Sequence, residues 1–494
     1  MRFHIVKSSL NRAVGISIVL LLGASLALAQ QQVNLSAGPS NLVMLDGNSV
    51  PMWGYSCGTA VPSSLASCGA LGKGAWSPVI VTVPSGQDLQ INLTNNLSFA
   101  GGKIPTSIVI VGQLGGGLGD LGQRKTAPSP THTPGVATWP IAGANPPAAE
   151  DPTFVPPPQG PRVQSFSTEV AAGATTSLTW TAPRPGTYLL ESGTHPSIQG
   201  PMGLYGIVVV TTAPTSGAAG TAYPNVSYNS EVPLLFSEID PVQNSAVNAA
   251  VNTTGFSETA VWSGQPGGCG DKSSQSYQTC YPPAVNYTPL YYLVNGQAFD
   301  KTNASNSLYT ASPVTGVTSG PGNVLVRLVN AGLRMHVPSI VGSLIGAGTT
   351  PASGFTLIAE DGNPLPGVPR VQNEVFMAAG KTYDVMINVP AAGSTALPIY
   401  DRELSLSGNS VNRDSGMLAY ISINGAGLPS GAIATAKANA DSYVVSCQST
   451  SCNTLTVADV SKGVIANDVN VFGVSVSTQP THGSVTLSAN RTFT

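Results

Sequence analysis

Short runs of alternating apolar and polar residues, separated by glycine and proline, recur along most of the chain. Ile91 and Leu93 alternate with Gln90 and Asn92, which is the pattern of a β-strand with one buried face. The continuous β-branched run from Ile207 to Val210 predicts a further strand. The chain therefore reads as a succession of short strands and turns.

The stretch from Gly186 to Val210 predicts a strand, a loop and a second strand. Tyr188 to Leu190 form the first apolar run, and a loop rich in glycine and proline follows it. Further along, Asn295-Gly296 after an apolar run predicts a hairpin turn. Glu238 and Asp240 form a possible carboxylate pair, but their position at the end of an apolar run is better explained as a strand end.

Composition agrees with an all-β fold. Only 9% of the 494 residues are charged, while 55 are glycine and 40 are proline. The scarcity of Glu, Lys and Arg disfavours long helices. The formal net charge is −3 and no basic patch stands out, so no nucleic-acid partner is expected.

The N-terminus predicts export from the cytoplasm. Basic residues precede an apolar run from Ala13 to Leu26, and Ala27-Leu28-Ala29 has the form of a cleavage site. A membrane anchor is the alternative, but the run is shorter than the roughly 20 residues that span a bilayer. Residues 1–29 are therefore predicted as a signal peptide, and no transmembrane segment is expected. We expect a secreted, periplasmic or cell-surface protein.

The six cysteines fall into three local pairs in loops rich in small polar residues. An even count with this spacing predicts three disulfides in an oxidising compartment. A thiolate metal site is the alternative, but no pair has the C-x-x-C spacing that such sites favour. The predicted pairs are Cys57 with Cys68, Cys269 with Cys280, and Cys447 with Cys452.

Two regions resemble the multicopper oxidase family. Gly186-Thr187-Tyr188 followed by Met202-Gly203-Leu204-Tyr205-Gly206 resembles the end of that family's first cupredoxin domain. The order of the Val-Asn-Gly hairpin, the Arg-Leu-Val-Asn-Ala strand and the Gly-Lys-Thr-Tyr-Asp-Val strand resembles its second domain. The resemblance implies tandem cupredoxin-like Greek-key β-sandwiches, copper as cofactor and oxidoreductase activity.

The expected copper ligands are missing from the first of these regions. Glu191, Ser192 and Gly193 stand where the family has His, Ser and His. The chain has five histidines and no His-Cys-His motif, too few for the family's copper set. This chain alone is therefore not expected to reduce oxygen, and no catalytic residue is assigned.

A repurposed metal site remains one interpretation of the same loop. Its ligands would be Glu191 and His195, with His132 from a proline-rich insertion. The alternative is that His195 is a polar loop residue bonded to the backbone, since a copper site normally needs three or more such ligands. His336 is expected to be a packing residue beyond a strand end.

The C-terminal residues resemble a bacterial Ig-like or cadherin-like repeat, through Gly463 to Asp468 and Gln479 to Leu487. The sequence stops where such repeats continue, so a partial sandwich and a longer parent protein are expected. The predicted organisation begins with a signal peptide (residues 1–29) and a first domain (30–212) that contains the insertion (126–161). A linker (213–222) leads to a second domain (223–428), and a second linker (429–445) leads to the partial repeat (446–494).

Two functions follow from these patterns. One is a secreted, copper-dependent oxidoreductase related to multicopper oxidases. The other is a non-catalytic cupredoxin scaffold or adhesin-like surface protein, with partners at a cell surface or in an extracellular assembly. The sequence specifies neither the substrate nor the oligomeric state.

Overall fold

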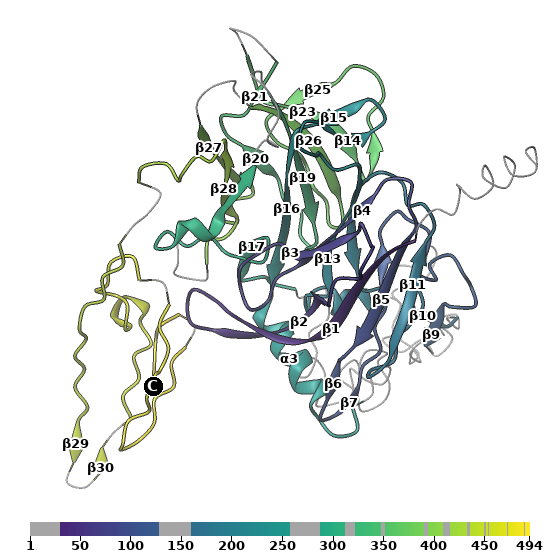
Figure 1. Ribbon diagram of the computed structural model, residues 1–494. Helices are drawn as coiled ribbons and strands as arrows, with labels where there is room; N and C mark the ends of the chain where they lie inside the picture. The colour runs from purple at the N-terminus through teal and green to yellow at the C-terminus, as the bar shows by residue number, and fades with distance from the viewer. Residues whose placement is uncertain are drawn as a thin grey trace, which may run out of the picture.

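The computed structural model describes most of the chain beyond the predicted signal peptide. Its described residues are 30–127, 160–256, 287–311, 322–346, 351–389, 394–408, 415–431, 435–448, 451–452, 454–471, 473–488 and 490–494. Strands form nearly all of the regular structure, arranged in two β-sandwiches with a C-terminal segment beside them (Figure 1). The all-β prediction is confirmed.

The first sandwich packs a four-stranded sheet against a five-stranded sheet. The four-stranded sheet has the order β11-β5-β1-β2, with β11 (Thr175–Trp180), β5 (Leu89–Asn95), β1 (Gln31–Val43) and β2 (Ser49–Cys57). The five-stranded sheet has the order β3-β4-β13-β12-β8, with β3 (Ser67–Ala70), β4 (Val79–Pro84), β13 (Tyr205–Thr211), β12 (Gly186–Glu191) and β8 (Val109–Ile110). Each sheet contains one parallel pair, β1 with β5 and β4 with β13.

The sequence pattern explains the placement of these strands. In β5 the apolar residues Ile91 and Leu93 are fully buried, while Gln90 and Asn92 on the other face are partly exposed. In β13 every residue is buried, because a second sandwich covers the outer side of the five-stranded sheet. The alternating pattern of β5 thus belongs to a sheet with one solvent-exposed face. The continuous apolar run of β13 belongs to a sheet that is covered on both faces.

The second sandwich has a seven-stranded and a four-stranded sheet. The larger sheet follows the order β17-β16-β19-β26-β23-β24, with β25 also paired to β23; its strands are β17 (Tyr291–Val294), β16 (Ser230–Ile239), β19 (Gly322–Asn330), β26 (Thr382–Val389), β23 (Phe355–Glu360), β24 (Asn363–Pro364) and β25 (Arg370–Gln372). The smaller sheet follows the order β18-β28-β27-β20, with β18 (Leu308–Ala311), β28 (Leu418–Ile423), β27 (Thr395–Asp401) and β20 (Pro338–Ile340).

The remaining elements are short. Two-stranded sheets pair β6 (Ser98–Phe99) with β7 (Gly102–Lys103), β9 (Lys125–Ala127) with β10 (Arg162–Ser165), β14 (Gly220–Tyr223) with β15 (Val226–Tyr228), β21 (Leu344–Ile345) with β22 (Ala352–Ser353), and β29 (Cys447–Gln448) with β30 (Ser451–Cys452). The described helical segments are α2 (Pro196–Gln199), α3 (Pro241–Val251), η3 (Ala304–Ser307) and η4 (Val460–Lys462).

Helix α3 begins at a residue that the sequence pattern placed at a strand end. The Asp240 carboxylate caps the helix by accepting from the backbone N–H groups of Val242 and Gln243, and Pro241 occupies the first turn. Among the described residues, no helix has the length and apolar character needed to cross a bilayer.

An interface of apolar packing and buried polar contacts joins the two sandwiches. Leu189 and Ile207 of the first sandwich pack in one cluster with Leu235 of the second. Beside them, the buried Arg327 guanidinium donates from Nη1 to Thr187 Oγ1 at 2.8 Å and from Nε to Glu231 Oε2 at 2.8 Å. The sandwiches are therefore fixed to each other by a buried polar contact as well as by apolar packing.

The C-terminal segment contacts the turn between β1 and β2 (Figure 1). The buried Asp46 carboxylate of that turn accepts from Tyr291 Oη at 2.9 Å and lies 3.2 Å from Arg491 Nη2. Residues 446–494 contain only two-residue strands and η4 in their described part. A partial Ig-like sandwich there stays a prediction.

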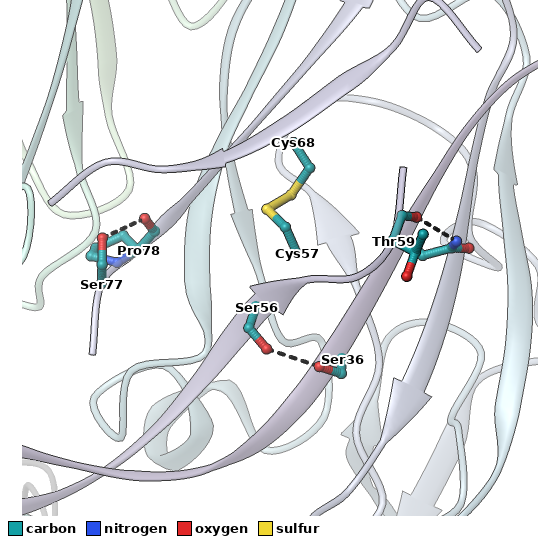
Figure 2. Close-up of a disulfide and its surroundings, with 8 residues drawn as sticks. Ser36, Ser56, Cys57, Thr59, Cys68, Ser77 and Pro78 are labelled. Atoms are coloured by element: carbon teal, nitrogen blue, oxygen red, sulfur yellow. Dashed lines mark hydrogen bonds between the residues drawn. A yellow bond between two sulfur atoms is a disulfide. The ribbon is translucent and has the colours of Figure 1, made fainter. Parts of the chain in front are cut away.

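One predicted disulfide is present between the edges of the two sheets of the first sandwich. Cys57 at the end of β2 is bonded to Cys68 in β3 (Figure 2). Cys447 is also disulfide-bonded, and its backbone pairs with that of Cys452 across β29 and β30. The predicted pair Cys269–Cys280 and most of the proline-rich insertion lie outside the described residues.

Candidate functional site

The candidate site is the loop between β12 and β13, at the end of the five-stranded sheet. Glu191 is the last residue of β12 and pairs with Tyr205 of β13 and Val109 of β8. The chain then turns through Ser192 and Gly193 into α2, which begins after His195. His195 has φ 40°, a left-handed conformation that few residues other than glycine adopt.

Hydroxyl groups fill the space beneath this loop. Ser192 Oγ donates to Gln199 Oε1 at 2.6 Å, and Thr106 Oγ1 donates to the same oxygen at 2.8 Å. Thr194 Oγ1 donates to Ser107 Oγ at 2.9 Å. All five side chains are fully buried, so the loop is held by a satisfied polar network.

Gly193 has no room for a side chain. A Cβ atom there would lie 2.6 Å from Val109 Cγ2 and 2.8 Å from Ser167 Oγ. Real Cβ contacts are essentially never this short, so the surrounding core would have to move. The packing around Gly193 therefore leaves no room for a side chain at the position where the family resemblance predicts a histidine.

Burial disfavours charge on both titratable residues of the loop. It raises the pKa of the Glu191 carboxyl to about 7 and lowers the pKa of the His195 imidazole to about 4. The His195 backbone N–H donates to Gln164 O at 2.9 Å, which ties the loop to β10. Near neutral pH His195 is therefore uncharged and Glu191 is partly protonated.

The described residues of this loop do not fit copper. Copper sites in proteins are built mainly from several imidazole or thiolate ligands, and the described part of the loop offers one imidazole and one carboxylate. Glu191 and His195 share the loop, as the sequence indicated, while His132 lies outside the described residues. Their joint binding of a metal stays a prediction.

A second polar centre lies in the second sandwich around His336, which the sequence pattern assigned to packing. Its Nδ1 lies 2.8 Å from Asp401 Oδ2 and its Nε2 lies 2.9 Å from Glu238 Oε2. Burial alone lowers the pKa of His336, but hydrogen bonds to Asp401 and Glu238 outweigh it and raise the pKa to about 9. His336 is thus buried as expected, but as an imidazolium between two carboxylates.

This centre also does not have the character of a copper site. Among the described residues, His336, Asp401 and the exposed Glu403 are the one set of three potential ligands whose atoms lie within 4.8 Å of one another. Both ring nitrogens of His336 are engaged by carboxylates, and the backbone N–H groups of Leu333 and Val337 satisfy further carboxylate oxygens. The arrangement fixes the loop between β19 and β20 to Glu238 of β16 and Asp401 of β27.

Comparisons with known proteins complete the description. No family model matches the chain, and no curated protein matches it. Among solved structures, the chain is similar to a blue copper oxidase from Nitrosomonas europaea, with 16% identity, a TM-score of 0.44, and coverage of 80% of this chain and 86% of that one.

Two further solved structures are similar to the chain. The multicopper oxidase mgLAC has 16% identity and a TM-score of 0.46, with 82% of this chain and 89% of that chain covered. A laccase from Botrytis aclada has 16% identity and a TM-score of 0.42, with 82% and 53% covered.

Proposed function

We propose that this chain is a non-catalytic, cupredoxin-like scaffold protein that acts outside the cytoplasm. The observation that carries the proposal is the closed loop after β12. There Ser192 is bonded into a hydroxyl network, and Gly193 leaves no space for a ligating side chain. A site that is filled by satisfied hydroxyls supports a structural role for the first sandwich.

The proposed organisation follows the sequence boundaries. A signal peptide, residues 1–29, would direct export, and two cupredoxin-like domains, residues 30–212 and 223–428, would form the scaffold. The C-terminal residues 446–494 would be an adhesin-like module. The Cys57–Cys68 disulfide supports an oxidising compartment, since such bonds rarely persist in the cytosol.

Copper loading of the mature chain tests this proposal. The purified chain from residue 30 onward is incubated with excess copper, passed through gel filtration and analysed for bound metal. We expect substoichiometric copper and no oxidation of phenolic substrates. One or more equivalents of retained copper, together with oxygen consumption, would instead support the copper-dependent oxidoreductase.

A variant pair separates a specific site from adventitious binding. His195→Ala removes the imidazole of the candidate loop, whereas His482→Ala removes an exposed imidazole in the C-terminal segment. Copper that is retained by the wild-type chain and by the His482 variant, but lost from the His195 variant, would contradict the proposal. Equal and low copper in all three proteins is the expected result.

A further inference from the structure

The outward side of the four-stranded sheet in the first sandwich carries no charged residue. Strands β11, β5, β1 and β2 contain no Asp, Glu, Lys, Arg or His at all. Their inward residues, such as Leu35 and Ile91, are buried in the core. Their outward residues are mainly Ser, Thr, Asn and Gln, and we call this side the polar face.

The strand register lines up these side chains in rows across the sheet. One row crosses all four strands, with each residue opposite the next. Its members are Thr175 of β11, Thr94 of β5, Ser36 of β1 and Ser56 of β2. Hydroxyl pairs link neighbouring strands at both ends of the row. Thr94 Oγ1 lies 2.8 Å from Thr175 Oγ1, and Ser36 Oγ lies 2.8 Å from Ser56 Oγ, the pair drawn in Figure 2.

The next row runs through Ser177 of β11, Asn92 of β5 and Asn34 of β1. Ser177 Oγ donates to Asn92 Oδ1 at 2.7 Å, and Asn92 Nδ2 donates to Asn34 Oδ1 at 2.9 Å. Asn34 Nδ2 in turn donates to the Thr59 carbonyl at 2.9 Å. These bonds hold the amides in one orientation, so a ligand would meet an ordered set of donors and acceptors.

A third row of Thr179, Gln90 and Gln32 completes the polar face. Neighbouring strands lie about 4.8 Å apart, and residues two positions apart along a strand lie about 6.7 Å apart. The polar face is therefore a regular array of neutral groups that both donate and accept hydrogen bonds.

A groove continues the array beyond Ser36 and Ser56. It has a volume of about 560 Å³, and its lining contains no charged residue. Gly38 and Gly54 line it on β1 and β2, with Asn96 beside them. Its size falls within the range of pockets that take small molecules, about 300–1,000 Å³.

We propose that the polar face and this groove bind a neutral polysaccharide. Sugar hydroxyls donate and accept hydrogen bonds, as do the side chains of the array, and an uncharged ligand matches its lack of charge. Nucleic acids and anionic lipids need cationic side chains. Protein interfaces are anchored by aromatic residues and arginine, which the outward positions of these strands do not supply.

The test is native affinity electrophoresis of the mature chain in gels that contain a soluble polysaccharide. The neutral set is laminarin, hydroxyethylcellulose, galactomannan and glycogen, with pull-down on insoluble cellulose and chitin. Heparin and alginate are the charged comparators. We expect retardation or retention by at least one neutral polysaccharide and by neither charged one.

Two variants assign the binding to this surface. Gly38→Leu places a side chain in the groove at little steric cost, since the nearest atom to a Cβ there is Asn96 Cβ at 3.8 Å. Ser36→Ala combined with Thr94→Val removes two hydroxyls of the first row. The loss of two hydrogen bonds predicts about tenfold weaker binding.

Gly427→Leu is the matched control, because a Cβ at that glycine has no atom within 4 Å. It is expected to bind as the wild-type chain does. Absence of binding to all six neutral polysaccharides, binding unchanged in both variants, or binding to heparin or alginate alone would each overturn the inference. None of these outcomes bears on copper, so this test and that of the proposed function are independent.

Discussion

His336 Nδ1 lies 2.8 Å from Asp401 Oδ2, and the opposite ring nitrogen lies 2.9 Å from Glu238 Oε2. An ionised carboxylate only accepts hydrogen bonds, so a ring between two of them must carry both protons. The three side chains come from separate parts of the second sandwich and have no exposed surface. The histidine therefore neutralises charge that would otherwise be buried without a partner.

This relationship predicts a loss of stability at alkaline pH. The pKa of His336 rises from 6.5 to about 9 on folding, so its contribution is complete below pH 6.5 and disappears as pH increases to 9. The fall in the free energy of unfolding over this window should be about 3 kcal/mol. Urea denaturation between pH 6 and pH 10 measures it.

Two variants identify His336 as the source of this pH dependence. His336→Gln should be less stable at pH 6.5 and should lack the alkaline fall. Glu191→Gln, whose carboxyl has a pKa of about 7 in the folded chain, should keep the fall between pH 7.5 and pH 9. An unchanged slope in the His336 variant would show that another group is responsible.

The closed loop predicts that Gly193→Ala is destabilising. The added methyl group would overlap Val109 and Ser167, and overpacking of this kind costs about 1–3 kcal/mol. Gly427→Ala, with open space around its Cβ, should change stability by less than about 0.5 kcal/mol. Chemical denaturation of the two variants compares them. A Gly193 variant as stable as the control would mean that the loop has spare room.

The buried ion pairs of Arg327 within the second sandwich predict a large effect for Arg327→Met. Removing the guanidinium leaves Asp384 and Glu231 without their buried cation, which costs about 3–5 kcal/mol in known cases. The exposed pair of Arg402 and Glu374 provides the control, and Arg402→Met should cost no more than about 1 kcal/mol.

Urea denaturation measures both arginine variants, and the transition of the Arg327 variant should also broaden if the sandwiches begin to unfold separately. Similar stability of the two variants would indicate that the buried ion pairs of Arg327 contribute little to the free energy of unfolding.

Local sequence patterns were sufficient for much of the fold. The alternation of Gln90 to Leu93 gave β5, and the run from Gly186 to Val210 gave β12, its loop and β13 in the right order. The Cys57–Cys68 disulfide also followed from local spacing. Helix α3 was missed, because its starting signal, Asp240 with Pro241, directly follows a strand and was taken for the strand's end.

The candidate site was only partly accessible from sequence. That Glu191, Ser192 and Gly193 stand in place of the expected ligands is a prediction that was accessible from the residues themselves. The filling of the space by Thr106 and Gln199 was not, since these residues lie 86 and 7 positions from Ser192. No local sequence pattern distinguishes a serine that replaces a ligand from a serine whose hydroxyl fills the space beneath the loop.

The sequence by itself determined the all-β class and the chemical identity of each side chain, because periodicity, turn residues and composition act over short distances. Tertiary structure alone decided which side chains that are far apart in the sequence meet. It brought His336 to Glu238, 98 residues away, and aligned Ser177, Asn92 and Asn34 in one row. Such contacts depend on strand order and register, which are set by the packing of the whole sandwich.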